Sequence, residues 1–202
     1  MAPLNRIVLV RHGETVGESS IRYYGATDVA LSDHGREQMR KASLALPGDA
    51  WDRVVTSPLS RAWESARIVA PRAPLRLLDE LREIDFGEWE GLTADEIRVR
   101  DPVLYEDWKG GRPGFGYPGG ERLEDFQARV DRAVSWMESS GARSILAIVH
   151  KGVIRAIARR LTGVELPPDA PALGGLVQLT RGVPGDWFVG RHASYPNPNP
   201  LF

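Results

Sequence analysis

The sequence predicts an α/β fold: a three-layer α/β/α sandwich with a mostly parallel central sheet. The prediction rests on three short apolar runs rich in β-branched residues, at positions 7–10, 53–56 and 145–149. Each run has the length and composition of a strand buried on both faces, and each is followed by a helix-start signal or a helical repeat. Such alternation of strand and helix is typical of a parallel sheet covered by helices.

Capping residues predict the limits of the helices. Ser32 before Asp33, and Ser57 before Pro58, are N-terminal signals, whereas a proline or a glycine marks the far end of each helix. We expect helices at about 33–46, 58–69, 123–138 and 152–161. Two further strands are expected at 175–180 and 187–190, before an extended tail at about 193–202.

Residues 84–120 are expected to form a small cap-like excursion over the active site, within a single domain that covers residues 1–202. The segment sets Trp89, Trp108 and Tyr117 among many glycines and contains a helical pattern near 93–100. Two interpretations stay open. The excursion either packs its aromatic side chains against one another at the surface or contacts a substrate.

Composition excludes several classes of function. The 202 residues carry 26 Lys and Arg against 27 Asp and Glu, so no basic field favours nucleic acid or a membrane surface. The absence of cysteine excludes disulfides, thiol catalysis and thiolate metal sites. The N-terminal apolar run is too short for a signal peptide. We expect a cytoplasmic monomer or homodimer with no nucleic-acid or membrane partner.

Charged and imidazole side chains follow all three predicted strands. Arg11 and His12 follow the first, residues 57–61 follow the second and end in an arginine, and His150 and Lys151 follow the third. In open α/β sheets, ligands bind beyond the carboxyl ends of the strands. We therefore expect these groups to meet at one edge of the sheet.

This set of groups favours phosphoryl transfer over acyl transfer or metal-dependent hydrolysis. A neutral imidazole can attack phosphorus, and guanidinium groups bind phosphate oxygens in pairs. Arginines beside the histidines would repel a divalent cation, so no metal and no cofactor is expected. The other two histidines, His34 and His192, have no partner in the sequence and are expected to be structural or solvated.

The segment LVRHGET (9–15) resembles the signature of the histidine phosphatase superfamily, also called the phosphoglycerate mutase-like family. An isolated RHG triplet is weak, but further blocks follow in the order of the family, so the resemblance runs from residue 6 to about 160. The blocks are YYGATDVALSDHGREQ (23–38), SPLSRAWESA (57–66), LREIDFGEWEGLT (81–93), PGGERLEDFQARV (118–130) and IVHKGVIRAI (148–157). The resemblance implies a three-layer sandwich with a smaller excursion.

The resemblance also implies the roles of the site residues. His12 would be the nucleophile, transiently phosphorylated, while Arg11, Arg61 and a protonated His150 hold the phosphoryl oxygens. Glu83 would be the general acid, with Asp85 and Glu88 as neighbouring alternatives. Further contacts to a small phosphorylated substrate are expected from Tyr24, Gly25, Glu18 and Lys151. No metal is required.

The block REIDFGEWEGLT is similar to the alpha-ribazole and broad-specificity phosphatases of the family rather than to its mutases. We therefore expect a phosphoric monoester hydrolase that acts on a small phosphorylated metabolite. Mutase-type phosphoryl transfer, and a phospho-ligand-binding protein with little turnover, remain as alternatives.

Two positions depart from the family pattern. Glu18 stands where asparagine is common, and Lys151 stands where glycine is common. One hypothesis is that Lys151 neutralises Glu18 in an ion pair. The other is that Glu18 reaches outward to the substrate while Lys151 binds the phosphate.

Overall fold

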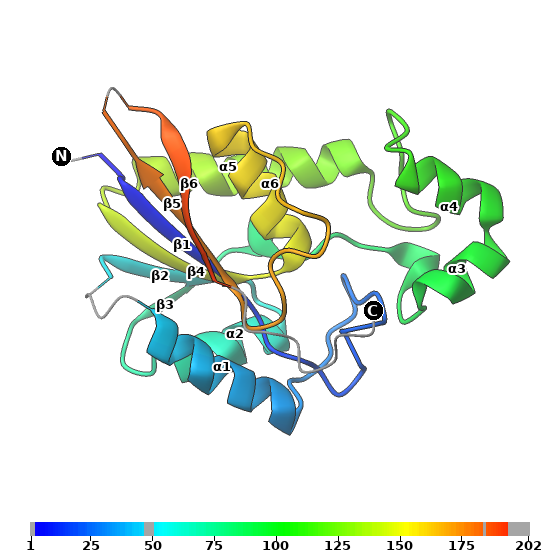
Figure 1. The fold of residues 1–202 in the computed structure, drawn as a ribbon, viewed down its shortest axis with the longest axis horizontal. Coiled ribbons are helices and arrows are strands. Elements are labelled where there is room, and N and C mark those ends of the chain that lie inside the picture. The colour runs from blue at the N-terminus through cyan, green and yellow to red at the C-terminus, as the bar shows by residue number, and fades with distance from the viewer. Residues whose placement is uncertain (1–2, 47–50, 184, 194–202) are drawn as a thin grey trace.

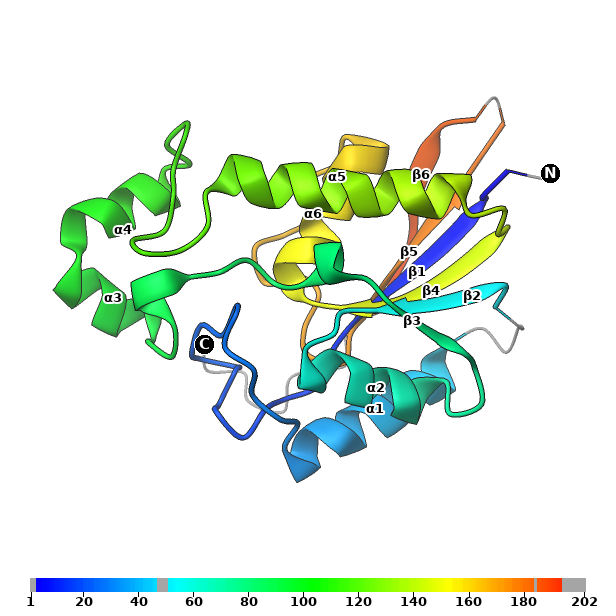
Figure 2. The same ribbon diagram turned by 180° about the vertical axis from the view of Figure 1, so that it is seen from behind.

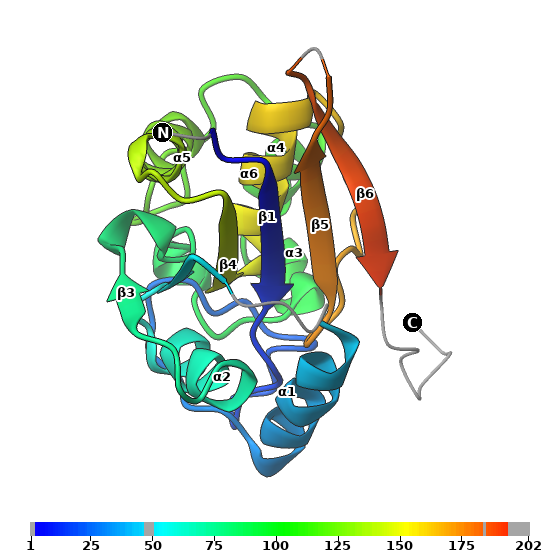
Figure 3. The same ribbon diagram turned by 90° about the vertical axis from the view of Figure 1, so that its left-hand side faces the viewer.

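The computed structural model describes residues 3–46, 51–183 and 185–193. One mixed sheet of six strands lies at the centre of the protein, in the order β3-β2-β4-β1-β5-β6 (Figure 3). The four strands β3, β2, β4 and β1 are parallel to one another. Strand β5 is antiparallel to β1, and β6 is antiparallel to β5. The strands are β1 (Arg6–Arg11), β2 (Arg53–Thr56), β3 (Leu75–Leu77), β4 (Ser144–Val149), β5 (Leu176–Arg181) and β6 (Trp187–Ala193).

Helices cover both faces of the sheet (Figures 1 and 2). Helices α1 (Asp33–Ala45) and α2 (Ser60–Val69) lie on one face, and α5 (Leu123–Ser139) and α6 (Lys151–Thr162) lie on the other. Side chains of β1 alternate between the two layers, because successive residues of a strand point to opposite faces. Ile7 and Leu9 pack in the core of α5 and α6, and Val8 packs in the core of α1. The predicted three-layer fold is confirmed.

Local signals place most helix ends within two residues of their expected positions. The Ser32 side chain accepts a hydrogen bond from Gly35 N at 3.0 Å, which caps α1. Helix α6 ends at Gly163, whose φ of 70° suits glycine. Helix α2 begins at Ser60 rather than at Pro58, because the Ser57 hydroxyl accepts from Leu59 N at 3.2 Å and forms a turn first.

Apart from the short helices of the excursion, one strand and one α-helix of the described residues were not expected from the sequence. Strand β3 has three residues with Arg76 at its centre, so it forms no apolar run. Helix α4 (Pro102–Lys109) has no fully buried residue and packs against the core through the partly buried Leu104, Tyr105 and Trp108. Most of the tail that was expected to be extended, residues 194–202, lies outside the described residues.

The segment between β3 and α5 leaves the sheet. It contains the short helices η1 (Asp79–Leu81) and η2 (Gly87–Trp89), then α3 (Ala94–Arg100) and α4. Helices α3 and α4 lie at the end of the protein toward which β1 runs (Figure 1). Their packing is aromatic: the Trp89 ring meets the rings of Tyr117 and Trp108 at centroid distances of 5.6 and 6.0 Å.

Candidate active site

The register of the sheet brings the two predicted site histidines together. Arg11 at the end of β1 pairs with Val149 at the end of β4, so the next residues, His12 and His150, are neighbours. Their ring centroids lie 5.1 Å apart. His12 N donates to Val149 O at 3.0 Å, which ties the first histidine to the adjacent strand. Both side chains are buried, His150 completely.

The orientation of the His12 ring suits a nucleophile. Its Nδ1 lies 2.7 Å from the carbonyl oxygen of Gly13, so Nδ1–H donates and the lone pair is on Nε2. Burial, followed by the positive charges of Arg61 and Arg11, lowers the pKa of His12 well below its usual value. The ring is therefore neutral at physiological pH and has its Nε2 available to attack phosphorus.

Arg61, at the start of α2, is completely buried beside the histidines. Its Nη1 donates to Thr27 O at 2.8 Å, and its Nη2 donates to Tyr24 O at 3.1 Å and to Gly25 O at 2.7 Å. The loop 24–27 thus holds the guanidinium by backbone carbonyls alone. A Cβ at residue 25 would collide with Ile84 O, so only glycine allows the loop to lie this close to the backbone of Ile84.

Four buried polar atoms around His12 have no hydrogen-bond partner within the described part of the chain. They are Nε of Arg11, Nε of Arg61 and both ring nitrogens of His150. Buried polar atoms in proteins are nearly always hydrogen-bonded, so such a cluster indicates a polar ligand. Two guanidinium groups and an imidazole match the oxygens of a phosphoryl group.

The protonation of His150 depends on its buried surroundings. Burial, followed by the charges of Arg61, His12 and Arg11, lowers the pKa of His150 well below its usual value. The protein's own charges therefore favour the neutral ring, and the protonated form expected during phosphoryl transfer would need the negative charge of a phosphoryl group. The neutral ring still offers one N–H donor to a phosphoryl oxygen, and a bound dianion would favour its protonation.

These two buried imidazoles predict a pH dependence of stability. Below about pH 6.5 the unfolded chain binds protons at both histidines and the folded protein does not. Each ring should therefore lower the free energy of unfolding by up to about 1.4 kcal/mol per pH unit as the pH falls toward its folded-state pKa. Urea unfolding between about pH 7 and about pH 5.5 measures this slope. The double variant His12→Asn/His150→Asn should show a shallower slope, and an unchanged slope would contradict the assignment.

Glu83 lies at the same site, in the segment between η1 and η2. Its side chain is buried, with Oε1 accepting from Ile84 N at 3.0 Å and Oε2 accepting from Gly152 N at 3.0 Å. Gly152 is the second residue of α6, so the carboxylate lies at the start of the helix that follows His150. Glu83 and His12 line the same cleft.

The neighbouring carboxylates have other partners. Asp85 Oδ1 accepts from Gly87 N at 2.8 Å and shapes the turn before η2. Glu88 is exposed and pairs with Arg100 on α3. Of these three acidic residues, Glu83 alone lines the cleft at His12.

A cleft of about 740 Å³ opens from His12 toward the excursion. Arg11, His12 and Glu83 are among its lining residues. An aromatic part of the lining comes from distant parts of the chain, and another part belongs to α6. The aromatic residues are Tyr23, Tyr24, Phe86, Trp108, Tyr117 and Phe126, and those of α6 are Lys151, Arg155 and Arg159. Trp108 and Tyr117 also pack within the excursion, so its aromatic residues both form a small core and line the cleft.

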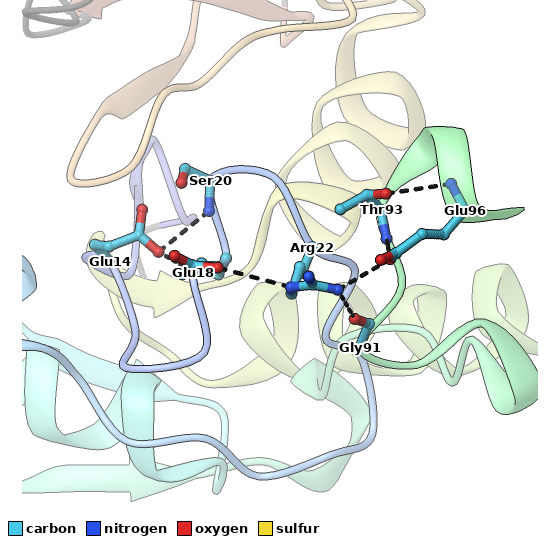
Figure 4. Close-up of polar contacts among 8 residues, drawn as sticks. Glu14, Glu18, Ser20, Arg22, Gly91, Thr93 and Glu96 are labelled. Atoms are coloured by element: carbon cyan, nitrogen blue, oxygen red, sulfur yellow. Dashed lines mark hydrogen bonds and ion pairs between the residues drawn. The ribbon is translucent and has the colours of Figure 1, made fainter.

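The predicted ion pair between Glu18 and Lys151 is wrong. Glu18 has a φ of 62° and a side chain that is 68% exposed, and its Oε2 lies 3.7 Å from Arg22 Nε. Arg22 in turn donates to Gly91 O and to Glu96, which joins this loop to α3 (Figure 4). Glu18 does not line the cleft.

Lys151, by contrast, lines the cleft and has no ion pair to any described residue. Burial, followed by the charges of Arg11 and Arg155, lowers the pKa of Lys151 to about 8. Tyr24 also lines the cleft, whereas Gly25 lies behind it and contacts Arg61. Of these three residues, Lys151 and Tyr24 therefore line the cleft and Gly25 does not.

Glu90 is a site residue that the sequence analysis missed. Its carboxylate accepts the backbone N–H groups of Gly25, Ala26 and Thr27, and that of Phe86, at 3.0–3.2 Å. It therefore holds the loop whose carbonyls bind Arg61. The segment GEWEG contains it, but contacts to backbone N–H groups leave no signal in the sequence.

The two remaining histidines lie elsewhere. His34 is exposed on α1, with its Nε2 3.1 Å from Gln38 Nε2. His192 pairs with Val177 in the sheet, and its side chain is outside the described part. Within the described ranges, no group of three His, Asp or Glu side chains gathers as metal ligands would, and no helix has the length and apolarity to cross a membrane.

Comparisons with known proteins show the family of this chain. Residues 7–172 match the model of the histidine phosphatase superfamily, branch 1. The adenosylcobalamin/alpha-ribazole phosphatase of Escherichia coli is 31% identical, over 82% of both chains. The glucosyl-3-phosphoglycerate phosphatase of Mycolicibacterium vanbaalenii is 31% identical, over 86% of this chain and 80% of its own.

A solved structure shares the whole architecture. The crystal structure of a putative alpha-ribazole-5'-P phosphatase from Escherichia coli superposes with a TM-score of 0.81 at 27% identity. The match covers 95% of this chain and 97% of that one. The chain therefore belongs to the histidine phosphatase superfamily and is a phosphoric monoester hydrolase.

Proposed function

We propose that this enzyme hydrolyses phosphomonoesters of small metabolites without a metal ion, through a phosphohistidine on Nε2 of His12. The cluster of unpartnered buried atoms on Arg11, Arg61 and His150 around a neutral imidazole carries the proposal. These groups would stabilise the equatorial oxygens of a metaphosphate-like transition state.

The reaction proceeds in two displacements. Nε2 of His12 attacks phosphorus while the bond to the ester oxygen breaks, and Glu83 gives its proton to the departing alkoxide. Water then attacks the phosphohistidine as Glu83, now a carboxylate, takes a proton from it. Inorganic phosphate leaves, and His12 and the protonated Glu83 are restored.

The cleft supports a substrate larger than phosphate. Its volume of about 740 Å³ and its aromatic wall leave room for a leaving group with an apolar part. Tyr24 and Lys151 would contact this substrate, the lysine as an unpaired cation beside Arg11. Relatives named as phosphatases of alpha-ribazole and of glucosyl-3-phosphoglycerate support a phosphorylated metabolite.

Phosphate release from p-nitrophenyl phosphate tests this function. Activity should persist in EDTA, because no step uses a metal, and vanadate should inhibit, because it adopts the shape of the in-line transition state. Loss of activity in EDTA that magnesium or manganese restores would contradict the mechanism. Phosphoryl transfer to a phosphoglycerate in place of release would indicate a mutase, and binding without turnover would indicate a phospho-ligand-binding protein.

A further inference from the structure

Arg129, on the face of α5 next to the site, uses all five of its N–H donors. Its Nε and Nη2 donate to Oε1 and Oε2 of Glu121 at 2.7 and 2.8 Å. The other three donors go to the backbone carbonyls of Glu80 at 2.9 Å, Arg82 at 2.6 Å and Glu83 at 3.0 Å. A planar guanidinium provides such a fork, and a lysine with three donors does not.

The Arg129–Glu121 pair is shielded from water and linked to both sides of Glu83. The side chains of the pair are only 15% and 18% exposed. Glu121 Oε2 accepts from Asp85 N at 3.3 Å, and Glu121 N donates to Asp85 O at 2.9 Å. The pair therefore holds the backbone before Glu83, at Glu83 and two residues after it.

The segment needs such support, because Glu83 lies in neither a helix nor a strand. Helix η1 ends at Leu81 and η2 begins at Gly87. Within the described part of the chain, the hydrogen bonds to the Glu83 side chain reach its carboxylate alone, from the N–H groups of Ile84 and Gly152. A misplacement of about 1 Å costs a catalytic group on the order of a hundredfold in rate.

We propose that Arg129, through its bidentate pair with Glu121, is a positioning residue that sets the position of the Glu83 carboxyl for proton donation to the leaving group. This inference rests on the proposed role of Glu83 as general acid. A buried ion pair is weak support for stability by itself, because desolvation of both charges offsets their attraction. The hydrogen bonds of this pair to the backbone around Glu83 indicate that it fixes the position of this segment.

The leaving group provides the test. Acid catalysis matters little for p-nitrophenolate, a good leaving group, and much for an alkoxide. The ratio of kcat for β-glycerol phosphate to kcat for p-nitrophenyl phosphate therefore measures how effectively Glu83 donates its proton to the leaving group. The variants are Arg129→Lys, which keeps the charge near His150 but loses the fork, and Glu121→Gln. Arg132→Lys, an exposed neighbour on α5, is the matched control.

We expect Arg129→Lys and Glu121→Gln to lower this ratio by about tenfold or more, with vanadate affinity close to that of the wild type, even where the loss of the buried pair lowers the temperature of thermal unfolding. Arg132→Lys should leave the ratio unchanged. Gly152→Ala should also lower it, because a Cβ at this position would collide with Glu83 Oε1. In a Glu83→Gln background, Arg129→Lys should cause no further fall in the ratio.

Two failures are distinguishable. In the first, Glu83→Gln lowers the ratio, but Arg129→Lys and Glu121→Gln both reduce the two rates equally or leave them unchanged. This result overturns the positioning role of Arg129 and retains Glu83 as the general acid. If Glu83→Gln itself leaves the ratio unchanged, the role of Glu83 as acid fails, and the positioning proposal fails with it.

Discussion

The variant His12→Ala should have no measurable turnover and should form no phosphoenzyme. The methyl side chain offers no nucleophile, and His150, the other imidazole of the site, is completely buried and would donate to a phosphoryl oxygen rather than attack phosphorus. Brief incubation with a radioactive phosphomonoester, followed by denaturation in base, measures the label, because phosphohistidine is stable in base and labile in acid.

His34→Ala is the matched control, since this histidine is exposed on α1 and outside the cleft. Its turnover and labelling should equal those of the wild type. A base-stable, acid-labile phosphoenzyme formed by His12→Ala would show that another histidine, His150 first among them, is the nucleophile.

The variant Glu83→Gln should bind substrate as the wild type does but turn over on the order of a hundredfold to ten-thousandfold more slowly with alkyl phosphates. Glutamine has the same shape and keeps an oxygen to accept from Gly152 N or Ile84 N, so the local structure should be retained. It has no proton to give to an alkoxide. The values of kcat and KM for an alkyl and an aryl phosphate measure the loss.

Asp85→Asn and Glu88→Gln are the controls for this variant. Their carboxylates lie outside the cleft, bound to Gly87 N and to Arg100, so both variants should retain acid catalysis. A normal rate of Glu83→Gln with alkyl phosphates, together with a slow rate of one control, would assign the acid to that neighbour.

The amino-acid sequence by itself determined the layers of the fold and the central part of the site. The runs that became β1, β2 and β4 are apolar and β-branched, so local composition was enough to predict them. The carboxyl ends of parallel strands meet at one edge, which predicted that His12 and His150 are neighbours and that Arg61 joins them. The role of Glu83 came from the family resemblance, and its place in the cleft is consistent with that role.

Only the tertiary structure decided which partners the remaining polar groups have. Glu18, whose φ is 62°, pairs with Arg22 rather than with Lys151 and does not line the cleft. Arg129 and Glu90 act mainly on backbone groups of other segments. Every residue has the same backbone donors and acceptors, so such contacts leave no pattern in a sequence, and only the folded chain shows which carbonyls and N–H groups face a given side chain.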